Sequence, residues 1–272
     1  MTEREEDPAG ADAPRTLGPD GRQARITDLV LSAGSVSAQE LAENFGVSVM
    51  TIHRDLDELQ RQGVLRKSRG VATAQPSGTF ESNVEYRAKA NTEAKRLIAQ
   101  HACRHIEPGM SVLLDDSTTA FQMLPHLAAL GPLTVATNYL AALVELARMR
   151  DVHVVALGGQ YDVQHDSFLG STCVDAVQSM RFDAAFVSTS AVSEGYAFHQ
   201  EDKIVTVKRA MVDVAARTHL LIDHTKLTRT ALHRLLPLHR FATVVVDAGV
   251  SARDLAALRE NDVLVEVAST AH

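Results

Sequence analysis

Six short and nearly continuous apolar runs in the second half of the chain place the strongest constraint on its fold. Each run has the length of a β-strand, and stretches with helical periodicity separate most of them. Runs of this kind predict strands buried on both faces, and their alternation with helices predicts a mainly parallel sheet. They read SVLLD from Ser111, LTVAT from Leu133, VHVVALGG from Val152, DAAFVST from Asp183, HLLID from His219 and FATVVVD from Phe241. The second half is therefore expected to be a Rossmann-like α/β domain.

Polar side chains or glycines follow five of these runs at the point where each run stops. Because the carboxyl ends of parallel strands meet at one edge of the sheet, where open α/β sheets bind ligands, these positions are expected to converge. They are Asp115, Thr137 with Asn138, Gly158 with Gly159, Ser188 with Thr189 and Ser190, and Asp223. The pattern predicts a crevice for a small molecule.

Three hydroxyl side chains, Ser117, Thr118 and Thr119, follow the first run and open a helix. Hydroxyls and unpaired backbone N–H groups at a helix N-terminus favour an anion, typically a phosphate. The alternative interpretation is that one hydroxyl only caps the helix. Lys208 and Lys226 are candidates for supplying cations to the same crevice, although a single lysine is more often a solvated surface residue.

Residues 37–70 have the pattern of a helix-turn-helix unit. Ser37 and Glu40 form a capping box, so a helix is expected to begin there and to end at Gly46. Ser48 is suited to cap a second helix, whose apolar stripe leaves its opposite face polar. In helix-turn-helix proteins the second helix enters the major groove of DNA.

The outward face of this second helix and the turn after it supply the candidate DNA contacts. Two apolar pairs, Val64-Leu65 and Val71-Ala72, flank a basic turn that suits the two strands of a wing. Basic residues that meet phosphate govern DNA affinity more than net charge does, so a formal net charge of −7 argues only weakly against a nucleic-acid partner. The candidates, with the two helix caps, are Ser37, Ser48, Met50, Thr51, His53, Arg54, Arg61, Lys67 and Arg69.

Changes in composition along the chain predict four segments. Residues 1–20 are acidic, rich in proline and glycine and without periodicity, which indicates a disordered tail. Residues 21–74 are expected to form the DNA-binding domain, 75–90 a polar linker, and 91–272 the α/β domain, which opens with a helix from Asn91 to His105.

Composition excludes several classes of protein. No apolar run approaches the length of a membrane helix, and the N-terminus lacks the pattern of a signal peptide, so a cytoplasmic location is expected. Cys103 and Cys173 are too few for a disulfide framework. The sequence has no nucleophile elbow and no phosphate-binding P-loop, so no catalytic residue is assigned and no cofactor is expected.

The pair His101 and His105 has the spacing that can place two imidazoles on one metal ion, with Cys103 between them. No third acidic or histidine ligand lies nearby in the sequence, and Cys103 is expected to point to another side of the helix. Metal binding is therefore not expected.

The two halves together resemble the DeoR family of bacterial transcriptional regulators. TIHRDLDELQRQGVL is similar to the family's recognition helix. The second half carries, in the family's order, a D-x-x-[ST]-T element from Asp115 to Thr119, the Thr137-Asn138 pair, the Gly158-Gly159 pair, Gly170, and D-H-T-K from Asp223 to Lys226. Three positions depart from the family pattern: His53 where an arginine is usual, the wing sequence Ser68 to Val71, and Ser117 in place of a glycine.

The resemblance implies a winged helix-turn-helix domain joined to a sensor domain that is similar in fold to ribose-5-phosphate isomerase and binds a phosphorylated sugar. It implies a repressor of sugar-metabolism genes that acts on double-stranded DNA as a homodimer or homotetramer. The alternative is a sugar-phosphate isomerase with an accessory DNA-binding domain. The residues after the fourth run, Ser188 to Ala191, include no carboxylate to act as a base, which favours binding without turnover.

Overall fold

The structure of the protein is a computed structural model that describes residues 18–74 and 81–269. The tail predicted for residues 1–20 lies outside the described residues, except for its last three positions. The described chain separates into two compact units. One contains the residues up to Arg61 together with Leu65–Ala74, and the other contains Gln62–Val64 and the described residues from Glu81 onward.

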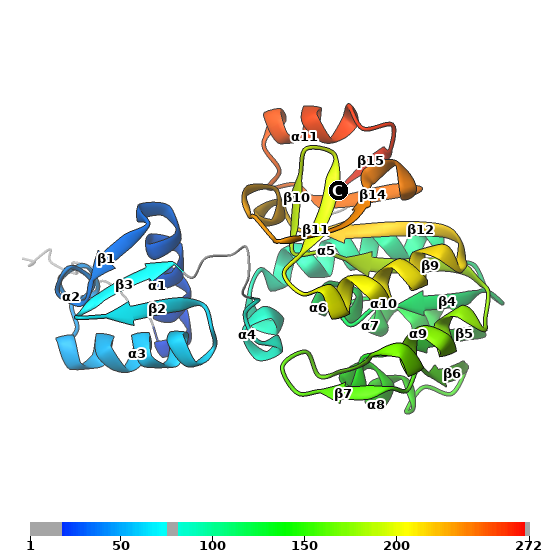
Figure 1. The fold of residues 1–272 in the computed structure, drawn as a ribbon, viewed down its shortest axis with the longest axis horizontal. Helices are drawn as coiled ribbons and strands as arrows, with labels where there is room; N and C mark the ends of the chain where they lie inside the picture. Colours follow the sequence, from blue (N-terminus) through cyan, green and yellow to red (C-terminus); the bar gives the residue numbers. More distant parts are fainter. Residues whose placement is uncertain (1–17, 75–80, 270–272) are drawn as a thin grey trace, which may run out of the picture. The chain divides into compact units, whose positions relative to one another are not determined.

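The first unit combines three helices with a small antiparallel sheet, drawn from blue to cyan in Figure 1. The strand order is β1-β3-β2. The elements are α1 (Pro19–Ala33), β1 (Ser35–Ser37), α2 (Ala38–Phe45), α3 (Val49–Arg61), β2 (Leu65–Ser68) and β3 (Val71–Ala74). This is the winged helix-turn-helix arrangement. Strand β1 was not predicted, and α1 begins at Pro19, inside the segment expected to be a disordered tail.

Local sequence signals account for the ends of α2. The Ser37 hydroxyl accepts a hydrogen bond from the Glu40 backbone N–H, and the Glu40 carboxylate accepts one from the Ser37 N–H. This is the predicted capping box. Gly46 ends the helix in the left-handed conformation, at φ 61°, which a glycine adopts without strain. The turn before α3 is therefore encoded by residues within it.

A buried ion pair connects α1 to α3 beneath the DNA-binding unit's surface. Arg22 Nε donates to Asp55 Oδ2 at 2.6 Å, and Arg22 Nη2 donates to Asp55 Oδ1 at 3.2 Å. Around the pair, Ile26, Ile52 and Leu56 are fully buried. The apolar stripe predicted for α3 thus packs inward, and the paired Asp55 is held among apolar neighbours by its arginine partner.

A seven-stranded parallel sheet forms the centre of the second unit. Its spatial order is β15-β14-β12-β9-β4-β5-β6. The strands are β4 (Ser111–Leu114), β5 (Leu133–Thr137), β6 (Val152–Ala156), β9 (Phe182–Ser188), β12 (Ala215–Ile222), β14 (Thr243–Asp247) and β15 (Leu264–Ala268). The first six correspond to the six apolar runs, which confirms the predicted parallel α/β fold. The edge strand β15 was not predicted.

The order of the strands reverses at the centre of the sheet. From β4 the chain continues outward in one direction through β5 and β6, then returns to place β9 on the other side of β4. The ends of β4 and β9 therefore lie at a topological switch point, where open α/β sheets leave a crevice for ligands.

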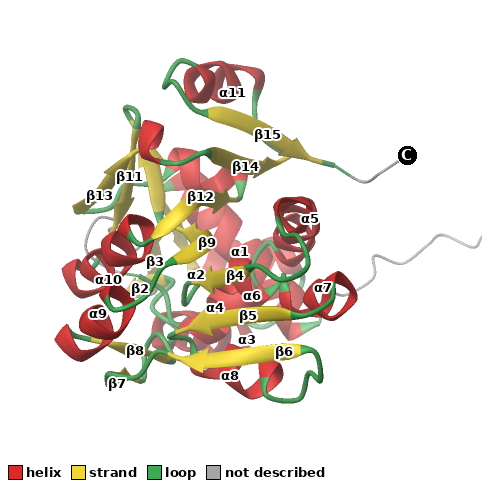
Figure 2. Cartoon of the chain, turned by 90° about the vertical axis from the view of Figure 1, so that its right-hand side faces the viewer, coloured by secondary structure: helices red, strands yellow, loops and turns green. Residues whose placement is uncertain are grey.

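Helices cover both faces of the sheet and enclose two separate apolar cores (Figure 2). Alternate strand residues face opposite cores: Leu220 packs into one and Leu221 into the other. Helices α9 (Ser171–Gln178), α10 (Asp202–Asp213) and α11 (Ala252–Arg259) contribute to the first core. Helices α5 (Thr92–Ala102), α6 (Thr118–Phe121), α7 (Leu124–Leu127) and α8 (Leu140–Leu146) contribute to the second.

Smaller elements extend the second unit. Strands β7 (Gln160–Asp162) and β8 (Ser167–Leu169) form a hairpin, while β10 (Ala191–Ser193), β11 (Tyr196–His199) and β13 (His233–Pro237) form a three-stranded sheet. Short 3-10 helices include η1 (Cys103–His105), η2 (Ala128–Leu130), η3 (His224–Thr228) and η4 (Leu238–Arg240). None of the helices within residues 18–74 and 81–269 is long and apolar enough to cross a membrane.

Helix α4 (Val84–Lys89) lies inside the segment predicted to be a linker. Asn83 caps it, because its side-chain oxygen accepts a hydrogen bond from the Tyr86 backbone N–H at 3.0 Å. Residues 75–80 of the expected linker lie outside the described residues. Residues 81–90 belong to the second unit, so the expected linker is too long at its C-terminal end.

Candidate functional site

The outward face of α3 carries the side chains predicted to contact DNA. Met50 is 64% exposed although it is apolar, and Arg54 is also exposed. Thr51 and His53 are half-buried at the flanks. The Ser48 hydroxyl accepts a hydrogen bond from the Thr51 backbone N–H at 3.1 Å, so Ser48 caps the start of the helix. These side chains are therefore accessible on α3 in the DNA-free protein.

Two of the predicted basic contacts already have acidic partners on α3. Lys67 Nζ lies 2.5 Å from Asp57 Oδ1, and Arg61 Nη2 lies 2.6 Å from Glu58 Oε1. Such exposed pairs contribute little stability, so a phosphate can compete for either base. No acidic residue lies between Arg61 and Arg69 along the chain, but in space Asp57 and Glu58 lie beside two of the basic residues.

The turn between β2 and β3 has left-handed backbone at both central residues. Arg69 has φ 49° and Gly70 has φ 80°. This geometry suits a tight hairpin turn, and Arg69 is exposed at its tip. The turn therefore presents a cation next to the edge of a short antiparallel ribbon, as expected for a wing.

A pocket opens in the second unit at the carboxyl ends of β4, β9 and β12. Eight of the predicted effector residues line it: Ser117, Thr118, Thr119, Ser188, Thr189, Lys208, Asp223 and Lys226. The residues that line it without having been predicted are Glu81, Ser82, Tyr86, Arg87, Ala90, Asn91, Lys95, His199 and Arg229. It lies at the switch point of the sheet.

Asp115 does not line the pocket, but it joins the loops that follow β4 and β9. Its Oδ1 accepts a hydrogen bond from the Ser117 N–H at 3.0 Å, and its Oδ2 accepts one from the Ser188 N–H at 2.7 Å. Lys208 forms ion pairs with Asp115 and with Asp116 Oδ1, the latter at 3.1 Å. The Lys208 pKa is raised because, despite burial, two carboxylates favour its charged form. The loops after β4 and β9 are therefore fixed by a buried charge cluster.

The three hydroxyls after β4 divide between two roles. Ser117 caps α6, because its Oγ accepts a hydrogen bond from the Ala120 N–H at 3.0 Å. Thr118 Oγ1 accepts a hydrogen bond from Lys95 Nζ at 3.0 Å and lines the pocket. The capping alternative thus holds for Ser117, while Thr118 belongs to the side of the pocket that carries positive charge.

Several cations gather around this side of the pocket. Burial lowers the pKa of Lys95 to about 7, and the positive charge of Lys226 is the next largest cause of this shift. Burial and the neighbouring Arg229 lower the pKa of Lys226 to about 8, although Asp223 opposes the shift. Buried amines whose pKa values are lowered further by neighbouring cations mark a site that an anion would stabilise.

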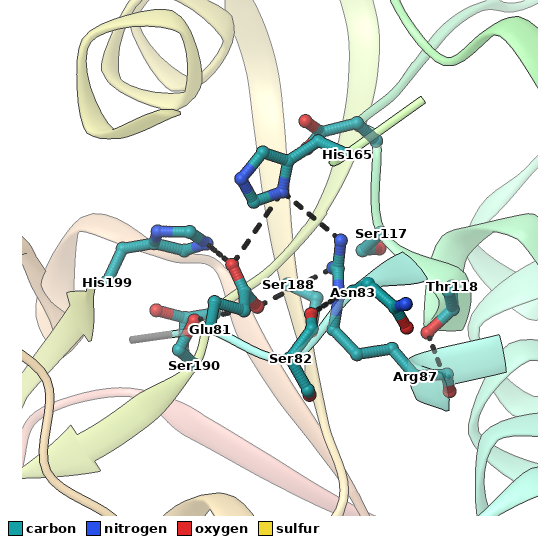
Figure 3. Close-up of polar contacts among 12 residues, drawn as sticks. Glu81, Ser82, Asn83, Arg87, Ser117, Thr118, His165, Ser188, Ser190 and His199 are labelled. Carbon is teal, nitrogen blue, oxygen red and sulfur yellow. Dashed lines mark hydrogen bonds and ion pairs between the residues drawn. The ribbon is translucent and has the colours of Figure 1, made fainter. Parts of the chain in front are cut away.

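The other side of the pocket holds a cluster around Glu81 (Figure 3). Glu81 Oε2 lies 3.0 Å from His199 Nε2, and Glu81 Oε1 lies 3.5 Å from Arg87 Nη1. The Ser190 hydroxyl donates to Glu81 Oε1 at 3.1 Å. Burial alone would raise the Glu81 pKa, but Arg87 and the two histidines, His199 and His165, outweigh it and hold the pKa well below its usual value. Glu81 is therefore a charged acceptor and a weak base.

This cluster also satisfies a simple distance criterion for a metal site. Ligand atoms of Glu81, His165 and Glu201 lie within 4.8 Å of one another. However, Arg87 pairs with Glu81, and Lys203 Nζ lies 2.9 Å from Glu201 Oε2. The carboxylates already have cationic partners, which disfavours a further cation at this place.

Two predicted strand ends do not join the pocket. Thr137, Asn138, Gly158 and Gly159 follow β5 and β6, on the far side of β4 from β9 and β12. A Cβ atom at Gly159 would lie 2.5 Å from the Leu169 carbonyl oxygen, so this glycine permits a close approach of two segments. Of the five predicted strand ends, residues after β4, β9 and β12 line this pocket, and those at the ends of β5 and β6 do not.

The residues that end β5, and Gly170 before α9, have structural roles outside the pocket. Thr137 Oγ1 accepts a hydrogen bond from the Tyr139 N–H at 3.1 Å, and Asn138 Nδ2 donates to the Phe168 carbonyl at 3.0 Å. Gly170 precedes α9 with φ 86°, a conformation that favours glycine. These residues shape the β7–β8 region rather than the pocket.

The comparisons with known proteins agree with this description. Residues 22–77 match the DeoR-like helix-turn-helix domain, and residues 90–248 match the DeoR C terminal sensor domain. The putative aga operon transcriptional repressor of Escherichia coli O157:H7 is 31% identical over 92% of this chain and 94% of that protein. The glycerol-3-phosphate regulon repressor of Escherichia coli strain K12 is 28% identical over 90% of this chain and 98% of that protein.

Among solved structures, ribose 5-phosphate isomerase A from Methanocaldococcus jannaschii gives a TM-score of 0.38 at 17% identity, over 51% of this chain and 55% of that chain. A likeness at this score supports no functional argument. The two family matches, one in each unit, do support a functional assignment. The chain belongs to the DeoR family and is a DNA-binding transcriptional regulator.

Proposed function

We propose that this regulator represses genes of sugar metabolism and that a phosphorylated sugar in the second unit's pocket controls it. The observation that carries the proposal is the gathering of Lys95, Lys226 and Arg229 beside the Thr118 hydroxyl in one pocket. The names of the relatives, an aga operon repressor and a glycerol-3-phosphate regulon repressor, support repression and a phosphorylated ligand.

The two sides of the pocket suit the two ends of such a ligand. The phosphate would take the cationic side, where its charge would restore the protonated forms of Lys95 and Lys226. Sugar hydroxyls would meet the polar side, where Glu81 is an acceptor and Thr189 and His199 line the wall. Carboxylate, imidazole and hydroxyl groups offer hydrogen bonds to neutral polyols without requiring further charge.

Helix α4 provides a physical route from ligand to DNA. Its segment is the first described part of the chain after the DNA-binding unit, and Arg87, Ala90 and Asn91 line the pocket. The Arg87 carbonyl accepts a hydrogen bond from Lys95, a residue on the cationic side. A ligand that favours one position of α4 would shift the population between DNA-competent and incompetent states, provided it binds the two states with different affinity.

On DNA, Met50, Thr51, His53 and Arg54 would read the major groove, as the exposed face of α3 suggests. The phosphate contacts would come from Arg61, Lys67 and Arg69, with Ser37 and Ser48 at the two helix starts. Because one helix-turn-helix unit reads only a short half-site, the protein would act in the cytoplasm as a homodimer or homotetramer.

A second candidate function is sugar-phosphate isomerisation. The sequence showed no carboxylate after β9, but the structure brings Glu81 into the pocket from a distant segment. The low pKa of Glu81 makes it a poor proton acceptor near neutral pH, which favours binding without turnover. Conversion of ribose 5-phosphate into ribulose 5-phosphate by the purified protein, lost in Glu81→Gln, would establish the enzyme instead.

The proposal is tested by coupling the two units in one assay. DNA fragments selected from a random pool by the full-length protein serve as operators, and fluorescence anisotropy follows binding during titration with pairs of phosphorylated and free sugars. We expect a phosphorylated sugar to change DNA affinity and its free counterpart to leave it unchanged. Thr206→Val, which alters an exposed threonine of α10, is the matched control for substitutions in the pocket.

A further inference from the structure

A second polar cluster lies at the end of α5, where it packs against the edge of the sheet. His101 Nε2 lies 2.8 Å from Glu266 Oε2, and His105 Nε2 lies 3.0 Å from the same oxygen. Glu266 comes from the unpredicted strand β15. None of the three residues lines the effector pocket. The third ligand that the sequence lacked near the histidine pair is therefore supplied by a strand more than 150 residues away along the chain.

We propose that His101, His105 and Glu266 bind a divalent cation of the Zn²⁺ type. Two imidazole nitrogens and one carboxylate are a common zinc donor set, with water completing four-coordinate geometry. Each donor retains access to solvent, since the three side chains are 17%, 20% and 24% exposed. An ion can therefore enter without unfolding the unit.

The step from the observed contacts to a bound ion is small. Two histidine nitrogens lie within hydrogen-bond distance of one carboxylate oxygen. To bind the ion through Nε2, each neutral ring would move its proton to Nδ1, and the two rings would turn toward the ion. Zinc lies about 2.0–2.2 Å from nitrogen and carboxylate oxygen donors, so the groups must open around the ion by side-chain rotation. His101 lies in the last turn of α5, and His105 ends the 3-10 helix η1 that follows it, so both rings reach Glu266 from consecutive helical turns.

The surroundings favour a cation here more than at the Glu81 cluster. His105 stacks on His219 with ring centroids 4.3 Å apart, and His219 stacks on Phe186 at 4.8 Å. The stack orients the His105 ring. Within the described residues, Glu266 pairs with the two histidines and with no lysine or arginine.

Cys103 does not belong to this site, although it lies between the two histidines in the sequence. Its side chain packs in the apolar core with Ile98 and Ala102, away from Glu266. The donor set is therefore two imidazoles and a carboxylate.

The competing description is a hydrogen-bonded clamp that joins α5 to β15 and never binds metal. Calorimetric titration of chelator-treated, tag-free full-length protein with Zn²⁺, repeated with Co²⁺ for its visible absorption, separates the two. We expect one equivalent to bind the wild type and at least tenfold weaker binding in both His101→Gln and Glu266→Gln, because removing even a supporting contact to a metal ligand commonly costs about 10- to 100-fold in affinity.

The control is His153→Gln, which removes an exposed histidine outside the cluster and should leave metal affinity unchanged. Thermal unfolding of metal-free variants shows whether each remains folded. Zn²⁺ should raise the Tm of the wild type and of His153→Gln but not that of the two ligand variants. Absence of binding to the wild type, or a loss of less than tenfold in either ligand variant, would overturn the site.

Discussion

The candidate DNA-contacting surface of the first unit and the candidate effector pocket of the second are built in opposite ways. The surface comes from one continuous stretch, its side chains are exposed or half-buried, and its ion pairs, such as Lys67 with Asp57, reach solvent. The pocket draws on segments from Glu81 to Arg229, and its central charges, Lys208 with Asp115, are buried. The difference teaches that substitutions on the surface should change binding alone, whereas many in the pocket should also change stability.

The largest effect is expected at Lys208. Lys208→Ala would leave two buried carboxylates without their cation, which should lower the free energy of unfolding by about 3–5 kcal/mol. Lys203→Ala is the matched control on the same helix, because Lys203 is 44% exposed where it pairs with Asp162. Its loss should be below about 1 kcal/mol. Urea unfolding followed by circular dichroism measures both, and equal losses would break the distinction between buried and exposed charges.

Thr118 tests the pocket's function apart from its charge cluster. Thr118→Val removes the acceptor of Lys95 at the anion side while keeping the shape of the side chain. We expect ligand affinity to fall by about 1.5–3 kcal/mol, the range for hydrogen bonds to charged groups, while DNA binding without ligand stays intact. Titration calorimetry with a responsive sugar phosphate gives the loss. A variant that binds and responds normally would remove Thr118 from the site.

Arg54 tests the surface side of the comparison. Arg54→Ala should weaken operator binding by about 1–3 kcal/mol if the guanidinium meets a base, and should change stability by no more than about 0.5 kcal/mol. Arg148→Ala removes an equal charge from an exposed position in the second unit and is the control. Fluorescence anisotropy and thermal unfolding report the two quantities. Unchanged affinity would exclude Arg54 from the interface.

The pH dependence should separate ligand binding from stability in the pocket. Between pH 7 and 10 the unfolded chain binds more protons at Lys95 than the folded chain, because the folded pKa is lowered to about 7. This lysine therefore makes the ligand-free protein more stable as pH rises. A phosphate needs the protonated amine, so ligand affinity should fall by up to about tenfold per pH unit across the same range. Calorimetry at several pH values measures this slope, and a flat profile would contradict the role of the lysines.

The features that could be predicted from the sequence are those that depend on local signals. The capping box at Ser37, the turn at Gly46 and the six strands each depend on residues close in the chain, and all are present in the structure. Thr118 and Ser188 were likewise found because both follow buried strands. The order of strands is a non-local property, so the polar ends at Thr137 and Gly158 could not be separated from those that line the pocket.

The residues missed by sequence reasoning have a common physical cause. Glu81 and Arg87 lie in a polar, aperiodic segment next to Pro76 and Gly78, which has the composition of a linker. Their partners are remote in the sequence: Glu81 pairs with His199, more than 100 positions away, and Arg87 contacts His165, 78 positions away. Asn83, which caps α4, is a local signal from which this helix could have been predicted, but it was not used. Glu266 was missed in the same way, because its histidine partners are equally remote.

The most direct test of the account is calorimetric binding of one sugar with and without its phosphate to the wild type and to Lys95→Met. The account predicts that the phosphorylated form binds the wild type, that the free sugar binds far more weakly, and that Lys95→Met loses most of the difference between them. Equal binding of both forms, or a preference for phosphate that survives Lys95→Met, would contradict a pocket that recognises phosphate through its buried lysines.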